Sequence, residues 1–165
     1  MNTQYKNYTF KIQEIVDEKS LDALQSIKVY ARKVDGQTLL LSNGAGDFSL
    51  YLHDRFFNFN ICGENKMISS FEGDIIQDKL KVTKLELPNN IIDAILFLNT
   101  NDNLIPGTGS YIEFNTSNLL YDSNKRLLQI GDIDSSDIAY HFFDNAYAQI
   151  KDGEMSGILF TELEL

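Results

Sequence analysis

The sequence predicts a single α+β domain over residues 1–165, built mainly on an antiparallel β-sheet of about eight to ten strands with two or three short helices. Many short segments alternate apolar and polar residues, which is the period of a half-buried strand. Most of these segments are joined by short connections containing Gly, Asn or Asp, and such connections join antiparallel neighbours. No Pro/Ser-rich linker or internal repeat divides the chain. The pattern leaves open whether the sheet curves or closes into a barrel.

The chain is expected to begin with a strand, a helix and a hairpin. Alternating apolar residues predict a strand over residues 8–12, and Ser20 predicts the N-cap of a short helix. Residues 27–34 fit either a helix or a strand. The following Asp35-Gly36 pair is typical of a tight hairpin turn. A short helix followed by a hairpin strand is therefore favoured.

The middle of the chain predicts an antiparallel meander. Residues 48–52 alternate apolar and polar side chains, and a short connection leads to a similar segment at 57–61. Residues 67–76 and 79–87, separated by two residues, predict a further pair of strands. Connections this short exclude parallel pairing between consecutive strands.

Two helices are expected in the second half. In residues 91–98, apolar side chains recur at i, i+3, i+4 and i+7, which predicts a short buried helix. Residues 134–151 begin with an Asp-Ser-Ser cap, carry an apolar face at helical spacing and end before Gly153. Strands are predicted around these helices at 111–114, 119–121, 126–130 and 157–161.

Acidic residues are concentrated near the end of the sequence. The chain carries 14 Lys and Arg residues against 24 Asp and Glu residues, a formal charge of −10. Residues 131–165 hold eight acids against Lys151, so this segment has a net charge of −7. A nucleic-acid partner is therefore unexpected, because such binding depends on Lys and Arg contacts to phosphates. A basic protein partner fits the charge instead.

The predicted C-terminal helix supplies the candidate binding residues. Positions i, i+4 and i+7 would place Asp137, His141 and Asp144 on one helix face. Further acids follow the helix, and a tyrosine within it could anchor an interface. The complete candidate set for partner binding is Asp137, Tyr140, His141, Asp144, Asp152 and Glu154.

No catalytic residue, metal site or cofactor is predicted. The run Asp132-Ile-Asp134-Ser-Ser-Asp137 resembles the opening of a calcium loop, but it lacks the required Gly and Glu, and helix capping explains it. The loop over residues 106–110 contains two glycines without the Lys of a phosphate-binding loop. Nothing in the sequence positions a histidine beside the single cysteine, Cys62.

The expected location is the cytoplasm. The first residues lack the apolar run of a signal peptide. The longest apolar stretch, residues 91–98, is far shorter than the roughly 20 residues of a transmembrane helix. A single cysteine cannot form an internal disulfide, which fits a reducing compartment.

In its overall character, a small, acidic α+β chain rich in Asn, Ile and Lys, the sequence resembles bacterial immunity proteins that protect against contact-dependent or polymorphic nuclease toxins. The resemblance implies a non-catalytic inhibitor whose partner is the basic domain of a toxin. Two other classes stay open: a small-molecule-binding or enzymatic antiparallel β domain, and a DNA-mimicking protein whose carboxylates stand in for phosphates.

Overall fold

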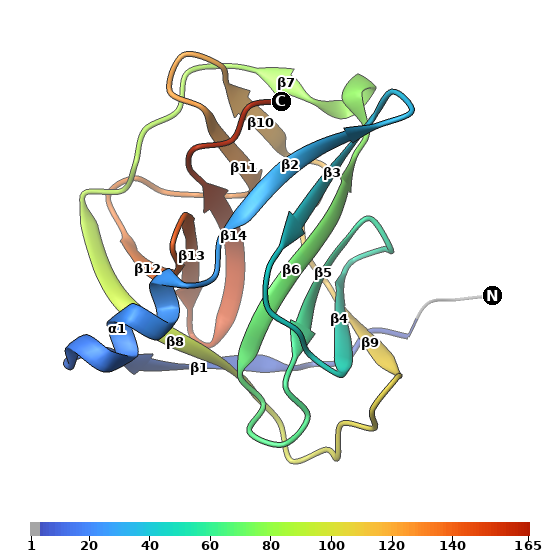
Figure 1. Cartoon of the computed structure of the whole chain (residues 1–165), viewed down its shortest axis with the longest axis vertical. Coiled ribbons are helices and arrows are strands. Elements are labelled where there is room, and N and C mark those ends of the chain that lie inside the picture. Colours follow the sequence, from blue (N-terminus) through green and yellow to red (C-terminus); the bar gives the residue numbers. More distant parts are fainter. Residues whose placement is uncertain (1–3) are drawn as a thin grey trace.

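The computed structural model describes residues 4–165 and shows two β-sheets packed face to face (Figure 1). In spatial order, the larger sheet comprises β1 (Thr9–Glu14), β8 (Asn90–Asn99), β12 (Ile138–Phe143), β13 (Ala146–Lys151), β14 (Glu154–Phe160), β11 (Leu127–Gly131), β10 (Leu119–Asp122) and β7 (Lys81–Val82). The smaller sheet comprises β2 (Val29–Val34), β3 (Gln37–Ser42), β6 (Ile68–Ile75), β5 (Phe57–Ile61), β4 (Phe48–Leu52) and β9 (Gly109–Ile112). Outside the strands, the described residues form one α-helix, α1 (Glu18–Gln25), and one 3-10 helix, η1 (Gln77–Lys79). Neither helix has the length and apolar character that crossing a membrane requires.

Aromatic side chains from both sheets meet in one core. Phe71 on β6 packs against Phe160 on β14, with ring centroids 4.9 Å apart. Phe59 on β5 packs edge-on against Phe142 on β12, with centroids 5.9 Å apart. All four rings are buried, and such contacts combine a large apolar area with a defined ring geometry. The sheets therefore form a sandwich and do not close into a barrel.

The predicted α+β class is wrong, because the described residues are mostly β and form fourteen strands in two mixed sheets. Three strand pairs are parallel: β8 with β12, β7 with β10, and β4 with β9. The strand predicted over residues 79–87 shrinks to β7, and residues 83–89 then cross one face of the larger sheet. Leu85 packs there on Leu127 and Leu159. The expected hairpin between β6 and β7 is absent because β7 pairs with β10 of the larger sheet, and the chain then enters β8 beside and parallel to β12.

The helix predicted over residues 91–98 is also wrong, since these residues belong to β8. Ala94, Leu96 and Leu98 face the core, while Ile95 and Phe97 on the opposite side of the strand are only partly exposed. A strand that is covered on both faces has a nearly continuous apolar sequence. In a short segment, such a sequence imitates the spacing of a buried helix.

The predicted C-terminal helix, residues 134–151, is instead the hairpin of β12 and β13. The strand register shifts between His141 and Phe143, and this bulge leaves the neighbouring rings of Phe142 and Phe143 both buried. The turn after Phe143 then restarts the alternation. Two strands interrupted in this way place apolar residues at intervals of three and four, as a helix would.

Near the N-terminus, the prediction is partly correct. The helix exists, but its N-cap is Asp17 and not Ser20: the Asp17 carboxylate accepts a hydrogen bond of 3.0 Å from the Ser20 main chain. The open choice for residues 27–34 resolves as strand β2. The hairpin turn is confirmed, because Asp35 and Gly36 both have positive φ, at 50° and 79°.

Candidate functional site: an acidic groove beside the C-terminal hairpin

Residues 132–137 connect β11 to β12 and cross the ends of β14 and β13 on the way. The Asp132 main chain donates to the Ser156 carbonyl over 2.9 Å, and the Asp134 main chain donates to the Gln149 side chain over 2.7 Å. The buried Gln149 carboxamide also donates to the main-chain carbonyls of Asp134 and Asp137. The segment is thus held through its main chain, which leaves its acidic side chains exposed.

A groove of about 490 Å³ lies beside this segment. We call it the acidic groove. Three exposed carboxylates belong to it, from Asp132, Asp134 and Asp137. Its full lining combines these with apolar and polar side chains: Asp132, Ile133, Asp134, Ser136, Asp137, Ile138, Tyr140, Gln149, Ile150, Lys151 and Ser156. The groove therefore offers negative charge next to apolar surface.

Two of the three carboxylates of the groove, those of Asp132 and Asp134, are held in place by hydrogen bonds. The Asp134 carboxylate accepts hydrogen bonds from the hydroxyl and the main chain of Ser136, at 2.7 and 2.9 Å. These bonds, with a smaller contribution from the charge of Lys151, lower the pKa of Asp134. The Asp132 carboxylate accepts from the amides of Asn118 and Asn115. Asp134 therefore stays ionised at neutral pH.

Two further hollows continue the acidic groove along the surface. The first shares Asp132 and Ser156 with it and extends past Glu113 to His53. The second shares Glu113 with the first and reaches Glu154. Acidic side chains thus recur along one connected depression.

The structure brings together only some of the predicted site residues. Asp137 and Tyr140 both line the acidic groove, and Glu154 lines the hollow at the far end of the depression. Asp152 lies in the exposed turn between β13 and β14, where its φ is 54°. His141 follows Tyr140 in a strand and so points to the opposite face of the larger sheet.

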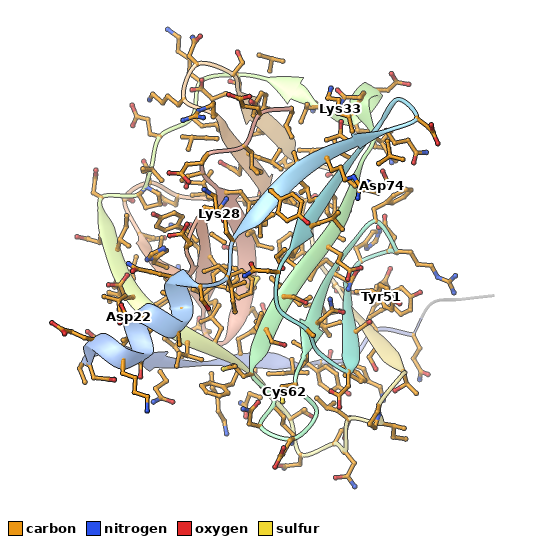
Figure 2. The ribbon with its side chains drawn as sticks, viewed as in Figure 1. Asp22, Lys28, Lys33, Tyr51, Cys62 and Asp74 are labelled. Carbon is orange, nitrogen blue, oxygen red and sulfur yellow. The ribbon has the colours of Figure 1, made fainter. Side chains whose placement is uncertain are left out.

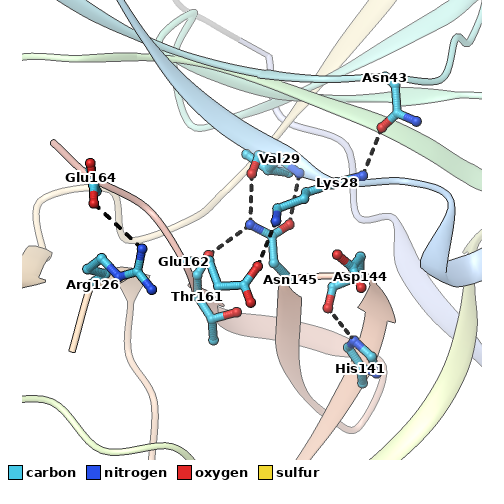
Figure 3. Close-up of polar contacts among 10 residues, drawn as sticks. All are labelled: Lys28, Val29, Asn43, Arg126, His141, Asp144, Asn145, Thr161, Glu162 and Glu164. Atoms are coloured by element: carbon cyan, nitrogen blue, oxygen red, sulfur yellow. Dashed lines mark hydrogen bonds and ion pairs between the residues drawn. The ribbon is translucent and has the colours of Figure 1, made fainter.

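His141 and Asp144 take part in a separate contact, and this contact is internal (Figure 3). The His141 side chain is only 12% exposed. Its Nδ1 lies 2.7 Å from the Asp93 carboxylate. Its Nε2 lies 2.9 Å from the Asp144 main-chain carbonyl. A carbonyl can only accept, so Nε2 carries a proton. The imidazole ring also stacks on Tyr147, with centroids 4.8 Å apart. His141 thus joins β8, β12 and β13, and both ring nitrogens are occupied.

Tyr147 makes the stability of the protein depend on pH in alkaline solution. Burial, and to a lesser degree the charges of Asp93, Asp144 and Glu162, raise the pKa of Tyr147 above its ordinary value of 10.0. The unfolded chain therefore loses this proton first, and the tyrosine's contribution to stability, complete below about pH 10, falls as the pH rises further. Tyr147→Phe is expected to flatten the loss of stability above that pH in urea titrations. An unchanged alkaline slope would contradict this expectation.

Gly157 lets residues 132–137 pass close to β14. A Cβ atom at this position would collide with the main-chain carbonyl of Asp132. Gly157→Ala is expected to lower the free energy of unfolding by on the order of 2 kcal/mol, because a close main-chain contact must open. Gly36→Ala is unsuitable as a control because Gly36 has positive φ, whereas Ser135→Ala changes an exposed residue of the same segment. Equal denaturation midpoints for the Gly157 and Ser135 variants would refute the role of Gly157.

The sequence predicts that Asp132 and Asp134 are capping residues, so neither belongs to the predicted binding set. The signal that points to them is the Asp-Ile-Asp-Ser-Ser-Asp run, whose alternate carboxylates also resemble a calcium loop. Among the described residues, no three His, Cys, Asp or Glu side chains come together in the arrangement of a metal site. Comparison with protein-family models and with curated protein sequences finds no match.

Proposed function

We propose that the protein is a non-catalytic inhibitor that binds a basic protein through the acidic groove. The observation that carries this proposal is the combination of exposed carboxylates with apolar side chains in one groove. Asp134 and Asp137 supply negative charge, while Ile138, Tyr140 and Ile150 supply apolar contact. A Lys or Arg side chain complements both features, because its apolar stem can contact the apolar residues while its cationic end meets the carboxylates.

The wider charge distribution supports the same class of partner. The whole chain carries −10, and most of this excess belongs to residues 131–165, which include much of the groove. Long-range attraction accelerates association with a basic partner, and complementary charge suppresses wrong partners. Both effects suit a stoichiometric inhibitor of a toxin.

The proposal extends to an immunity protein that neutralises a basic, nuclease-type bacterial toxin in the cytoplasm. Such a partner binds nucleic acid with Lys and Arg side chains, which are the groups that the acidic groove would cover. No cofactor is needed for inhibition of this kind. The single cysteine, Cys62, is free, which fits a reducing compartment.

The test joins capture with an activity. The immobilised protein is exposed to a lysate of the producing bacterium at low salt, and retained proteins are released at high salt. We expect a basic protein that cleaves DNA or RNA, and we expect cleavage to stop when the two proteins are mixed in equal amounts. A captured protein whose activity is unaffected at any ratio would refute the proposed function.

A further inference from the structure

The smaller sheet ends in a strand whose outer edge is only partly used. β2 pairs with β3 on one side and is the last strand of the sheet. Val29 directs its main-chain groups away from β3: its N–H donates to the Asn145 side-chain oxygen over 2.8 Å, and its carbonyl accepts from the Asn145 amide over 2.7 Å. Main-chain groups alternate sides along an antiparallel strand. Ala31 and Lys33 therefore also face outward.

Asn145 occupies the place of a neighbouring strand at one position only. Its carboxamide makes with Val29 the two hydrogen bonds that a residue of an adjacent strand would make (Figure 3). Within residues 4–165, no outward main-chain hydrogen bond is recorded for Ala31 or Lys33. The edge thus leaves two consecutive pairing positions unfilled, directly beyond one that is filled.

The side chains beside these positions are apolar and basic. Tyr30 and Val34 are 49% and 37% exposed, and Arg32 lies between them on the same face of the strand. Lys33 stands near the end of β2, beside the hairpin turn (Figure 2). In the described part of the chain, neither Arg32 nor Lys33 has a carboxylate within ion-pair distance. Their charge is therefore available to a partner.

A second copy of the chain fits this edge poorly. Antiparallel self-pairing through the two open positions places Arg32 opposite Arg32, or Lys33 opposite Lys33 in the next register. Like charges directly across a strand pair are destabilising. The remaining register needs the Val29 position, which Asn145 fills.

We propose that the edge of β2 accepts an extended strand from a partner protein, with an acidic residue opposite Arg32 and apolar residues against Tyr30 and Val34. Main-chain bonds to Ala31 and Lys33 provide the affinity, and the basic side chains select the sequence, as in other cases of strand addition. This surface does not include the acidic groove, so the inference stands independently of the proposed function.

The test uses two short synthetic peptides, one with valine, threonine, glutamate, threonine and valine in that order and one with lysine in place of glutamate. Side chains two positions apart share a face of a strand, so this order places the charge opposite Arg32 and the valines opposite Tyr30 and Val34. The glutamate peptide is expected to bind about tenfold more tightly, since an attractive contact with Arg32 replaces a repulsive one. In NMR spectra, it should shift the amide signals of Ala31 and Lys33 and slow their hydrogen exchange. Equal binding of both peptides, or no effect on these two amides, would overturn the proposal.

Three variants separate main-chain pairing from charge. Lys33→Pro removes an outward N–H without removing a bond to β3, and it should abolish binding, whereas Lys33→Gln retains the N–H and should weaken binding only modestly. Arg32→Glu should reverse the preference toward the lysine peptide. This variant remains decisive if the proline variant fails to fold. Binding by Lys33→Pro that equals the wild type, or an unchanged preference in Arg32→Glu, would contradict strand addition.

Discussion

Asn145→Ala is expected to lower the free energy of unfolding by about 3–5 kcal/mol, because several buried main-chain groups lose their partners at once. Asn145 is fully buried and donates to the carbonyls of Val29 and Thr161, at 2.7 and 2.8 Å, while its oxygen accepts from the Val29 N–H. Val29 begins β2 in the smaller sheet, and Thr161 follows β14 in the larger one. One carboxamide therefore joins the two sheets at the point where the β12–β13 turn meets β2 (Figure 3).

Urea denaturation of the variant measures this effect, and two further substitutions serve as controls. Asn118→Ala removes a partly exposed amide that contacts the exposed carboxylate of Asp132, and it should cost less than about 1 kcal/mol. Asn145→Asp retains the bond from Val29 N–H but turns a carboxylate oxygen toward two carbonyls, so it should be at least as damaging as alanine. Similar stabilities for Asn145→Ala and Asn118→Ala would show that the sheets do not depend on this bridge.

The nearby ion pair between Lys28 and Glu162 adds much less. The two groups lie 2.7 Å apart, but their side chains are 48% and 53% exposed. Exposed pairs contribute little, because water and salt screen their attraction. The hydrogen bond and charge of Lys28 lower the pKa of Glu162, so its small stabilising contribution is present at neutral pH and is lost as the solution becomes acidic.

Alternation predicted the strands that are covered on one face. Phe48, Leu50 and Leu52 point into the core from β4, as their spacing indicates, and the connection to β5 is short enough to require antiparallel pairing. The same reasoning failed for β8 and β12, where apolar side chains occupy both faces or a bulge changes the phase. The spacing of apolar residues indicates which faces of a segment are buried. It distinguishes a strand from a helix only when a single face is buried.

In the site, too, the sequence predicts residues that are close together along the chain but not contacts between distant segments. Asp137 lies in the turn directly before β12 and is only three positions from Tyr140, so both line the groove although the predicted helix is absent. The partner of His141 is Asp93, which lies 48 positions away and reaches it through the parallel register of β8 and β12. That register depends on residues 83–89 crossing the larger sheet. No local spacing in the sequence could indicate it.

Reversing two charges in the acidic groove is expected to weaken partner binding about hundredfold, or roughly 2.7 kcal/mol. The variant is Asp134→Lys combined with Asp137→Lys, and its binding to the captured basic partner is measured by surface plasmon resonance, which gives the affinity and both rates. Both carboxylates line the groove, and Asp134 is kept ionised by Ser136. A lysine in the partner would then meet lysine in place of aspartate, beside the same apolar side chains.

The matched control changes the net charge equally but elsewhere: Asp22→Lys on α1 combined with Glu86→Lys, both at exposed positions. Long-range attraction responds to total charge, so both double variants should slow association at low salt. Only the groove variant should dissociate faster, and only its defect should persist at high salt. The single variant Asp137→Lys tests whether the double variant acts only by disturbing the fold of residues 132–137. The structure shows no hydrogen bond to the Asp137 carboxylate, so this substitution should leave the segment in place. Equal losses in the two double variants would mean that the partner senses the overall charge and does not contact the groove.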